Sequence, residues 1–171
     1  MLTIESLSAA QARDALPELA KLLRDSVESG ASIGFVLPLE QEAVDAYWEK
    51  VIADLEVGAR VLLLAYLEGR AVGTAQLGLE GRQNGNHRAE VQKVLVHTTA
   101  RRRGVGRALM DALEAEARAR TRTLLVLDTA GDDAERVYCA AGYTLVGRIP
   151  DYARSPHGDG FDATAIYYKA L

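Results

Sequence analysis

Cysteine is almost absent from this sequence, since Cys139 is the only one among 171 residues. A disulfide within the chain and a cysteine-based metal site are therefore excluded. Long apolar runs are also missing, and no stretch approaches the ~20 residues that a membrane-spanning helix requires. The first residues lack the basic start and apolar run of a secretory signal peptide. These absences favour a cytoplasmic protein that does not associate with membranes.

An excess of positive charge is missing as well. The formal net charge is −4, which argues against a nucleic-acid-binding surface. The three histidines, at positions 87, 97 and 157, lack the spacing of metal ligands or of a catalytic triad, and we expect no metal. Hydrophobic residues make up 49% and charged residues 26% of the chain, a balance typical of a globular protein. With no internal repeat or low-complexity linker, residues 1–171 are expected to form a single domain, either monomeric or homodimeric.

Hydrophobic periodicity predicts a mixed α/β fold. Hairpin signals in the first half favour antiparallel pairing, and the β-α-β unit around residues 89–127 requires a crossover and a parallel pair. The predicted order is β-α-α-β-β-β-α-β-α-β-β. Its helices are expected at 9–29, 39–55, 104–120 and 134–141, its strands at 1–5, 60–67, 71–79, 89–96, 123–127, 143–148 and 163–169, and a loop at 149–160.

The most informative segment runs from the strand that ends at Val96 into the helix that begins near Gly104. The first N–H groups of a helix have no internal partner, and the helix dipole attracts negative charge there. Two glycines let a bulky phosphate approach the backbone, although they cost helix stability unless a ligand binds. The alternative is an ordinary surface helix with solvated arginines. The residues expected at this phosphate site are Val94, Leu95, Val96, Arg101, Arg102, Arg103, Gly104, Val105, Gly106 and Arg107.

Two motifs resemble a known family. Arg101-x-x-Gly104-x-Gly106 after a strand resembles the acetyl-CoA signature of the GCN5-related N-acetyltransferase (GNAT) superfamily. Ala134-x-x-x-Tyr138-x-x-x-Gly142-Tyr143 resembles its second motif, and the two occur in the right order. Over most of residues 28–171 the chain is also similar to the tabtoxin resistance acetyltransferases, through segments 30–35, 88–93, 127–129, 134–138 and 163–169.

The resemblance implies a GNAT fold, acetyl-CoA as co-substrate, and direct transfer of the acetyl group to an amine. It also implies that the strand containing Val94 and Val96 parts from its neighbour and pairs with the pantetheine arm. A small-molecule acceptor is expected, such as an amino-acid-like toxin or an antibiotic. A protein or peptide amine, a polyamine, and a non-catalytic acyl-CoA-binding module are the alternatives.

Three residues are candidates for catalysis. Glu90 is expected to be the general base, half-buried and on one strand face with Gln92 and Val94, although it could be a solvated edge charge. Asp128 follows an apolar strand and is expected to hold the substrate ammonium or share the role of base, unless it only caps a turn. Tyr138 is expected to be the general acid, with a pKa of ~10, unless it is a core residue.

The candidates for the acceptor pocket are Ser32, Phe35 and Tyr152. The loop from residue 30 to 35 carries two of them and belongs to the resemblance. Trp48 is a further candidate, although residues such as Phe35 and Trp48 are more often found in the core.

Overall fold

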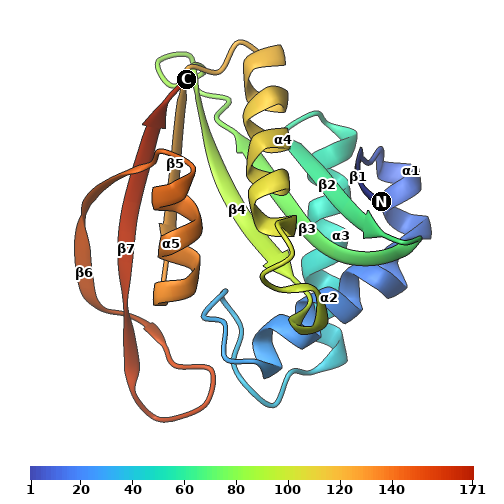
Figure 1. The fold of residues 1–171 in the computed structure, drawn as a ribbon, viewed down its shortest axis with the longest axis vertical. Helices are drawn as coiled ribbons and strands as arrows, with labels where there is room; N and C mark the ends of the chain where they lie inside the picture. Colours follow the sequence, from blue (N-terminus) through green and yellow to red (C-terminus); the bar gives the residue numbers. More distant parts are fainter.

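The computed structural model describes residues 1–171 and places them in a seven-stranded mixed sheet with helices on both faces (Figure 1). The strand order is β1-β2-β3-β4-β5-β7-β6, and only the β4–β5 pair is parallel. The predicted fold class is therefore confirmed. The elements are β1 (Leu2–Ser6), α1 (Ala9–Asp14), α2 (Leu16–Glu28), α3 (Gln41–Glu56), β2 (Arg60–Leu67), β3 (Arg70–Leu79), β4 (Arg88–Val96), a 3₁₀ turn (Thr98–Ala100), α4 (Val105–Ala119), β5 (Leu124–Thr129), α5 (Asp132–Ala140), β6 (Thr144–Arg154) and β7 (Phe161–Ala170).

Strand β2 contributes to a separate hydrophobic core on each face of the sheet. Its residues Val61, Leu63 and Ala65 are buried with α4 and α5 in one core. Leu62 and Leu64 are buried with α1, α2 and α3 in the other. Successive side chains of a strand point to opposite faces, so an uninterrupted apolar run is what a strand covered on both faces requires. No helix of the chain has the length and apolar character needed to cross a membrane.

The helix expected over 9–29 is two helices. It breaks at Ala15, which caps both α1 and α2, and Pro17 lies in the first turn of α2. Proline has no N–H to donate and is tolerated in a first helical turn but not in a helix interior. The proline therefore marks the start of a second helix that the periodicity did not distinguish.

Strand β6 extends through the first half of the segment expected to be a loop. It pairs with β7 as far as Arg154, across a register shift between Ile149 and Ala153 that contains Pro150. Strand β6 lies at the edge of the sheet, and Pro150 lies where its pairing with β7 is interrupted. The missing N–H of this proline therefore costs no regular hydrogen bond between strands. Only residues 155–160 form a loop between β6 and β7.

Strand β4 contains a bulge that changes which side chains share a face. Thr74 and Gln76 of β3 are two residues apart, but their partners on β4, Leu95 and Gln92, are three apart. Lys93 takes up the extra residue with a left-handed φ of 49°. Such an insertion reverses the alternation beyond it.

The expectation that Val94 shares a face with Glu90 and Gln92 is therefore wrong. Val94 and Val96 pack against the core of α4 and α5. Gln92 instead points to the face covered by α3, where it accepts a hydrogen bond from Arg60.

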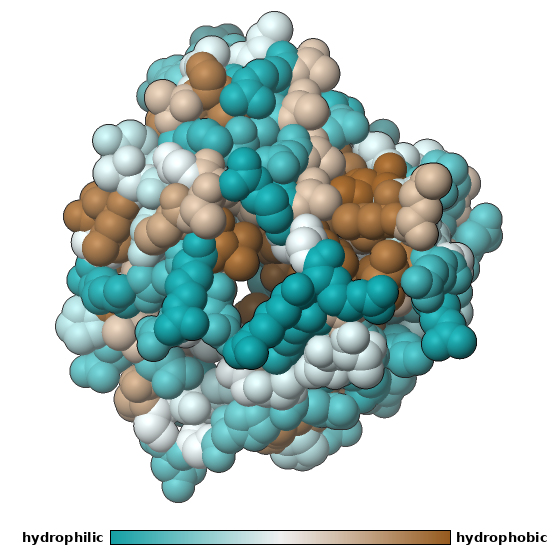
Figure 2. Space-filling view, in the orientation of Figure 1, coloured by the Kyte–Doolittle hydropathy of each residue, from teal (hydrophilic) through white to brown (hydrophobic).

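Strands β4 and β5 pair over three residues only, from Arg88–Leu124 to Glu90–Val126. Beyond Glu90, the rest of β4 has no partner on this side, and the two ribbons diverge in Figure 1. Figure 2 shows a hollow near the middle of this view, between the positions of β4 and α5, with hydrophilic residues at its rim and hydrophobic residues deeper. The separation of the strands opens a passage between the two faces of the sheet.

Gly73 of β3 is expected to be essential for the close packing of α4. A Cβ at this position would lie 2.9 Å from the carbonyl oxygen of Leu95 and 3.0 Å from Val105 Cγ1. Gly73→Ala should therefore lower the free energy of unfolding by about 1–3 kcal/mol. Gly78→Ala on the same strand is the control, because its Cβ would lie 3.5 Å from the flexible side chain of Gln92. Urea denaturation of both variants tests this, and equal stabilities would contradict it.

Candidate active site

Glu90 and Asp128 project from the same face of the sheet. Glu90 lies beside Val126 in the parallel pair, and Asp128 follows two residues later. Leu125 and Leu127 are buried in the core of α4 and α5. By alternation, Val126 and Asp128 face the opposite side, with Glu90 beside them. The predicted pair of carboxylates therefore comes together where β4 and β5 separate.

The two carboxylates differ in how they are held. Asp128 Oδ2 accepts a hydrogen bond of 3.0 Å from Thr164 Oγ1 of β7, which fixes its orientation. Glu90 makes no ion pair or side-chain hydrogen bond and is exposed. The expected half-burial of Glu90 is wrong: Glu90 is exposed, and it is the last residue of β4 that pairs with β5. An exposed carboxylate at a strand opening is accessible to water and to an incoming amine.

Tyr138 lies on α5, on the other face of the sheet. Its side chain is 7% exposed, and its ring centroid is 6.1 Å from that of Tyr143. Burial, together with the negative charge of Asp128, raises the pKa of Tyr138 to about 12. This lies above the unperturbed value of ~10, so the phenol keeps its proton at neutral pH. Full proton transfer to a thiolate of pKa ~8.5 is unfavourable, so this phenol suits a hydrogen-bond donor to a developing thiolate.

The start of α4 presents a run of free donors. The backbone N–H groups of residues 102–107 donate no hydrogen bond within the chain. Gly104 caps the helix with a φ of 81° and supplies no capping side chain. A Cβ at Gly104 would meet no atom within 4 Å, so the space beside this backbone is open. Six unpaired donors at a helix N-terminus form a site for an anion such as a phosphate.

Most arginines of this segment already have partners. Arg101 donates to Ser29 Oγ at 2.6 Å, and Arg107 donates to the carbonyl oxygen of Ala140 at 2.8 Å. Arg102 is exposed and makes no ion pair. Arg101 and Arg107 thus tie the segment to α2 and α5, and the backbone remains the main source of donors for a ligand.

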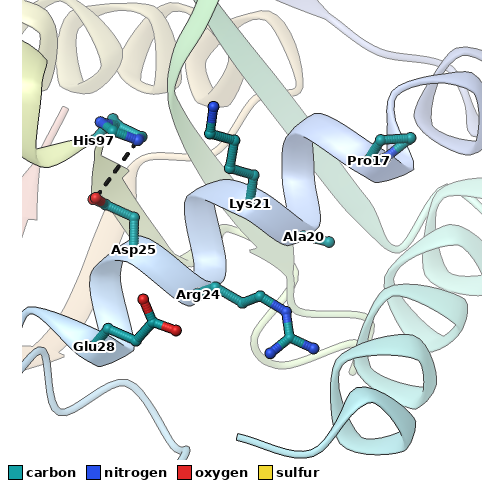
Figure 3. Close-up of a pocket in the computed structure, with 7 residues that line it drawn as sticks. All are labelled: Pro17, Ala20, Lys21, Arg24, Asp25, Glu28 and His97. Atoms are coloured by element: carbon teal, nitrogen blue, oxygen red, sulfur yellow. Dashed lines mark ion pairs between the residues drawn. The ribbon is translucent and has the colours of Figure 1, made fainter.

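Asp25 of α2 fixes the turn that leads into this segment. Its carboxylate accepts hydrogen bonds from the Thr98 N–H at 2.8 Å and from Thr98 Oγ1 at 2.7 Å, and it faces His97 Nε2 at 3.5 Å. Figure 3 shows Asp25 and His97 pointing toward each other at one end of a shallow cavity of about 440 Å³. Sequence analysis missed Asp25, because an aspartate on a polar helix face gives no signal of a distant partner. The cavity is lined by Pro17, Ala20, Lys21, Arg24, Asp25, Glu28 and His97.

The loop between α2 and α3 forms one wall beside the carboxylates. Ser32 and Phe35 are half-buried, and the Phe35 ring meets Tyr47 of α3 edge to face at 5.5 Å. The N–H of Leu37 donates to the carbonyl oxygen of Pro156 at 3.1 Å, so the loop between β6 and β7 reaches this wall. Two chain segments that are far apart in sequence therefore meet on this face.

The other aromatic candidates lie elsewhere. Tyr152 is 54% exposed on the edge strand β6, and no contact joins it to the carboxylates. Trp48 is fully buried in the core of α1, α2 and α3, which confirms its alternative assignment as a core residue.

A polar network on the same face was not predicted. Arg60 Nη1 donates to Gln76 Oε1 at 2.7 Å and to Gln92 Oε1 at 2.6 Å, and Arg60 pairs with Asp54 at 2.8 Å. Tyr47 hydrogen bonds to Gln76 at 2.8 Å. The available signal was glutamine at two positions of otherwise apolar strands, since buried amides need partners.

A comparison with protein families identifies the chain. The model described as "Acetyltransferase (GNAT) family" matches residues 19–143. The chain belongs to the GNAT acetyltransferase family. Among curated proteins, a relative from Azospirillum brasilense described as an uncharacterized N-acetyltransferase in the hisH-hisA intergenic region is 34% identical over 128 residues, which are 74% of each chain. This GNAT protein is therefore an acyltransferase.

It contains no group of three or more histidine, cysteine, aspartate or glutamate side chains placed to hold a metal ion.

Two solved structures share the fold of this chain. A ribosomal-protein-alanine N-acetyltransferase from Brucella melitensis superposes with a TM-score of 0.77 at 23% identity, covering 99% of each chain. The protein yncA from Salmonella typhimurium, solved with its cofactor acetyl-CoA, superposes with a TM-score of 0.79 at 17% identity, covering 100% of this chain and 94% of its own.

Replacing Asp25 should loosen the turn before α4. Asp25→Ala removes the acceptor for two hydrogen bonds from Thr98, and hydrogen bonds to a charged group contribute roughly 1.5–3 kcal/mol. We expect the free energy of unfolding to fall by about that amount, measured by chemical denaturation. Glu28→Ala in the same cavity is the control, because Glu28 has no hydrogen-bond partner. The assignment is wrong if the two variants are equally stable.

Proposed function

We propose that this GNAT protein is an acetyl-CoA-dependent N-acetyltransferase that acetylates a small-molecule amine by direct transfer. The observation that supports it most is the opening between β4 and β5. Free backbone donors lie at the start of α4, and two carboxylates lie on the opposite face of the sheet. A donor and an acceptor bound on opposite faces would meet at this opening.

The α4 segment would hold acetyl-CoA. The free N–H groups of residues 102–107 fit the pyrophosphate, and Arg102 is available to add a charge-assisted contact. The β4 backbone around Val94 and Val96, unpaired on its β5 side, fits the amide groups of the pantetheine arm. Acetyl-CoA supplies the acetyl group as an activated thioester. Its presence in the structure of yncA, which shares the fold, supports this assignment.

The carboxylates would prepare the amine. Asp128, oriented by Thr164, would attract the ammonium form of the acceptor. Glu90 would take one proton, directly or through a water molecule, because an ammonium has no lone pair with which to attack. The new C–N bond then replaces the C–S bond of the thioester. The sulfur would leave as a thiolate that accepts a hydrogen bond from Tyr138, and the second proton lost by the nitrogen would pass to this thiolate or to solvent.

Enclosure of the acceptor side favours a small molecule. The contact between Leu37 and Pro156 brings two loops together over this face, whereas a protein substrate needs an open groove for its extended chain. The Brucella relative is named for an alanine of a ribosomal protein, so a peptide N-terminus is the alternative that the test must include. A non-catalytic acyl-CoA-binding module would not need Glu90, Asp128 and Tyr138 together. Within the small molecules, we propose an amino-acid-like compound, such as a toxin or an antibiotic.

The decisive experiment measures CoA release with a thiol reagent. The protein is incubated with acetyl-CoA and, separately, with amino acids, polyamines, aminated antibiotics and alanine-terminated peptides. Release with small amines supports the proposal, and release with peptides alone overturns the acceptor class. Tight acetyl-CoA binding without release from any amine would indicate a binding module.

Tyr138→Phe should reduce kcat by about 10²-fold and leave the Kd for acetyl-CoA nearly unchanged. The ring and its packing remain, and only the hydroxyl that would face the sulfur is lost. Tyr143→Phe is the matched control, because its buried hydroxyl has no hydrogen-bond partner and its loss should not lower kcat. If acetyl-CoA affinity collapses in Tyr138→Phe, this tyrosine has a structural role instead.

Gly104→Val should weaken acetyl-CoA binding by at least tenfold, since a branched side chain would cover the free N–H groups. Gly58→Val is the control, because Gly58 has a similar φ of 69° and, like Gly104, open space around its Cβ position. Both variants share the backbone strain, and only Gly104→Val should lose affinity. Isothermal titration with acetyl-CoA measures the difference, and equal Kd values would rule out the pyrophosphate assignment.

A further inference from the structure

Lys93 occupies the bulge of β4, beside the two carboxylates. Its Nζ lies 5.7 Å from the centroid of the Tyr47 ring. A Cβ on Gly34 would lie 4.0 Å from the same Nζ, so the ammonium lies close to the loop between α2 and α3. Lys93 therefore points to the face that carries Glu90 and Asp128, toward Tyr47 and that loop.

The ammonium of Lys93 has no anionic partner. It takes part in none of the ion pairs or side-chain hydrogen bonds of the chain, and its side chain is half-buried. Arg60, the other cation on this face, is paired with Asp54. An ammonium that has lost water is stabilised by an opposite charge in direct contact. Lys93 contacts the face of the Tyr47 ring, and the charges of Asp128 and Glu90 act on it without forming an ion pair.

We propose that Lys93 binds an anionic group of the acceptor, such as a carboxylate, and selects amino acids or related zwitterions over simple amines. This inference rests on the proposed acetyltransferase function and specifies its substrate class. Lys93 acts here as a specificity-determining residue and takes no part in the proton transfer.

The charges on this face match a zwitterion. Glu90 and Asp128 attract the ammonium that becomes the nucleophile, and Lys93 attracts an anion bound beside it. A simple amine would place a second cation near Lys93 and leave Lys93 without a partner. Charge complementarity of this kind gives specificity because the wrong ligand leaves a buried charge unpaired.

The protonation of Lys93 agrees with this role. Burial lowers the pKa of Lys93, and the neighbouring charge of Arg60 lowers it further, while Asp128 and Glu90 oppose the shift. An acceptor carboxylate would add a negative charge in contact with the ammonium and favour its charged form.

The test compares acceptors that differ only in the carboxylate. Lysine is paired with cadaverine and ornithine with putrescine, and kcat/KM is measured for wild-type protein and for Lys93→Met. Wild-type protein should prefer each amino acid, and Lys93→Met should lose about tenfold to a hundredfold in kcat/KM for the amino acids, chiefly through KM. The decarboxylated amines should be acetylated as well as before, or better.

Two further variants separate charge recognition from a structural role. Lys93→Arg keeps the cation and should restore part of the preference for amino acids. Lys50→Met removes an exposed lysine of α3 and should leave the preference unchanged. The inference is overturned if wild-type protein prefers the decarboxylated amines, or if Lys93→Met lowers kcat/KM equally for both members of each pair. Absence of CoA release with every acceptor class would instead overturn the proposed function.

Discussion

The single extra residue in β4 is the constraint on which the site depends. An inserted residue reverses the alternation of the strand, so Glu90 and Gln92 face α3 while Val94 and Val96 face α4. The same strand loses its pairing with β5 directly beyond Glu90. Because of these two irregularities, one strand contributes a carboxylate to one side of the sheet and free backbone to the gap. A regular β4, paired along its full length, would close this passage.

The surrounding structure holds this irregular region rigid. Asp25 and Arg101 connect the end of β4 and the following turn to α2. Arg107 connects the first turns of α4 to α5. Asp128 is oriented by Thr164 of β7. Preorganised polar groups lose little freedom when a ligand binds, so these hydrogen bonds favour a site that is already formed in the free protein.

Much of the fold was predictable, because the apolar runs of β2 and β3 and the stripe of α4 follow simple periodicities. The free donors before α4 were predictable from two glycines at a helix start. The bulge was not predictable from the sequence, because the apolar and polar side chains of residues 89–96 also fit a regular strand. Only the pairing register with β3 shows the inserted residue. For the same reason the orientation of Lys93 was missed. Tyr138 was identified by its motif, but its raised pKa follows from burial, which only the tertiary structure specifies.

The opposite placement of the two proposed binding regions has an evolutionary consequence. The groups expected to bind the donor belong to α4 and the gap-facing backbone of β4, whereas the walls of the acceptor side come from the α2–α3 loop, α3 and the β6–β7 loop. Substitutions or insertions in those loops can reshape one compartment without disturbing the other. Such a division allows a lineage to exchange acceptors while its use of the donor stays constant.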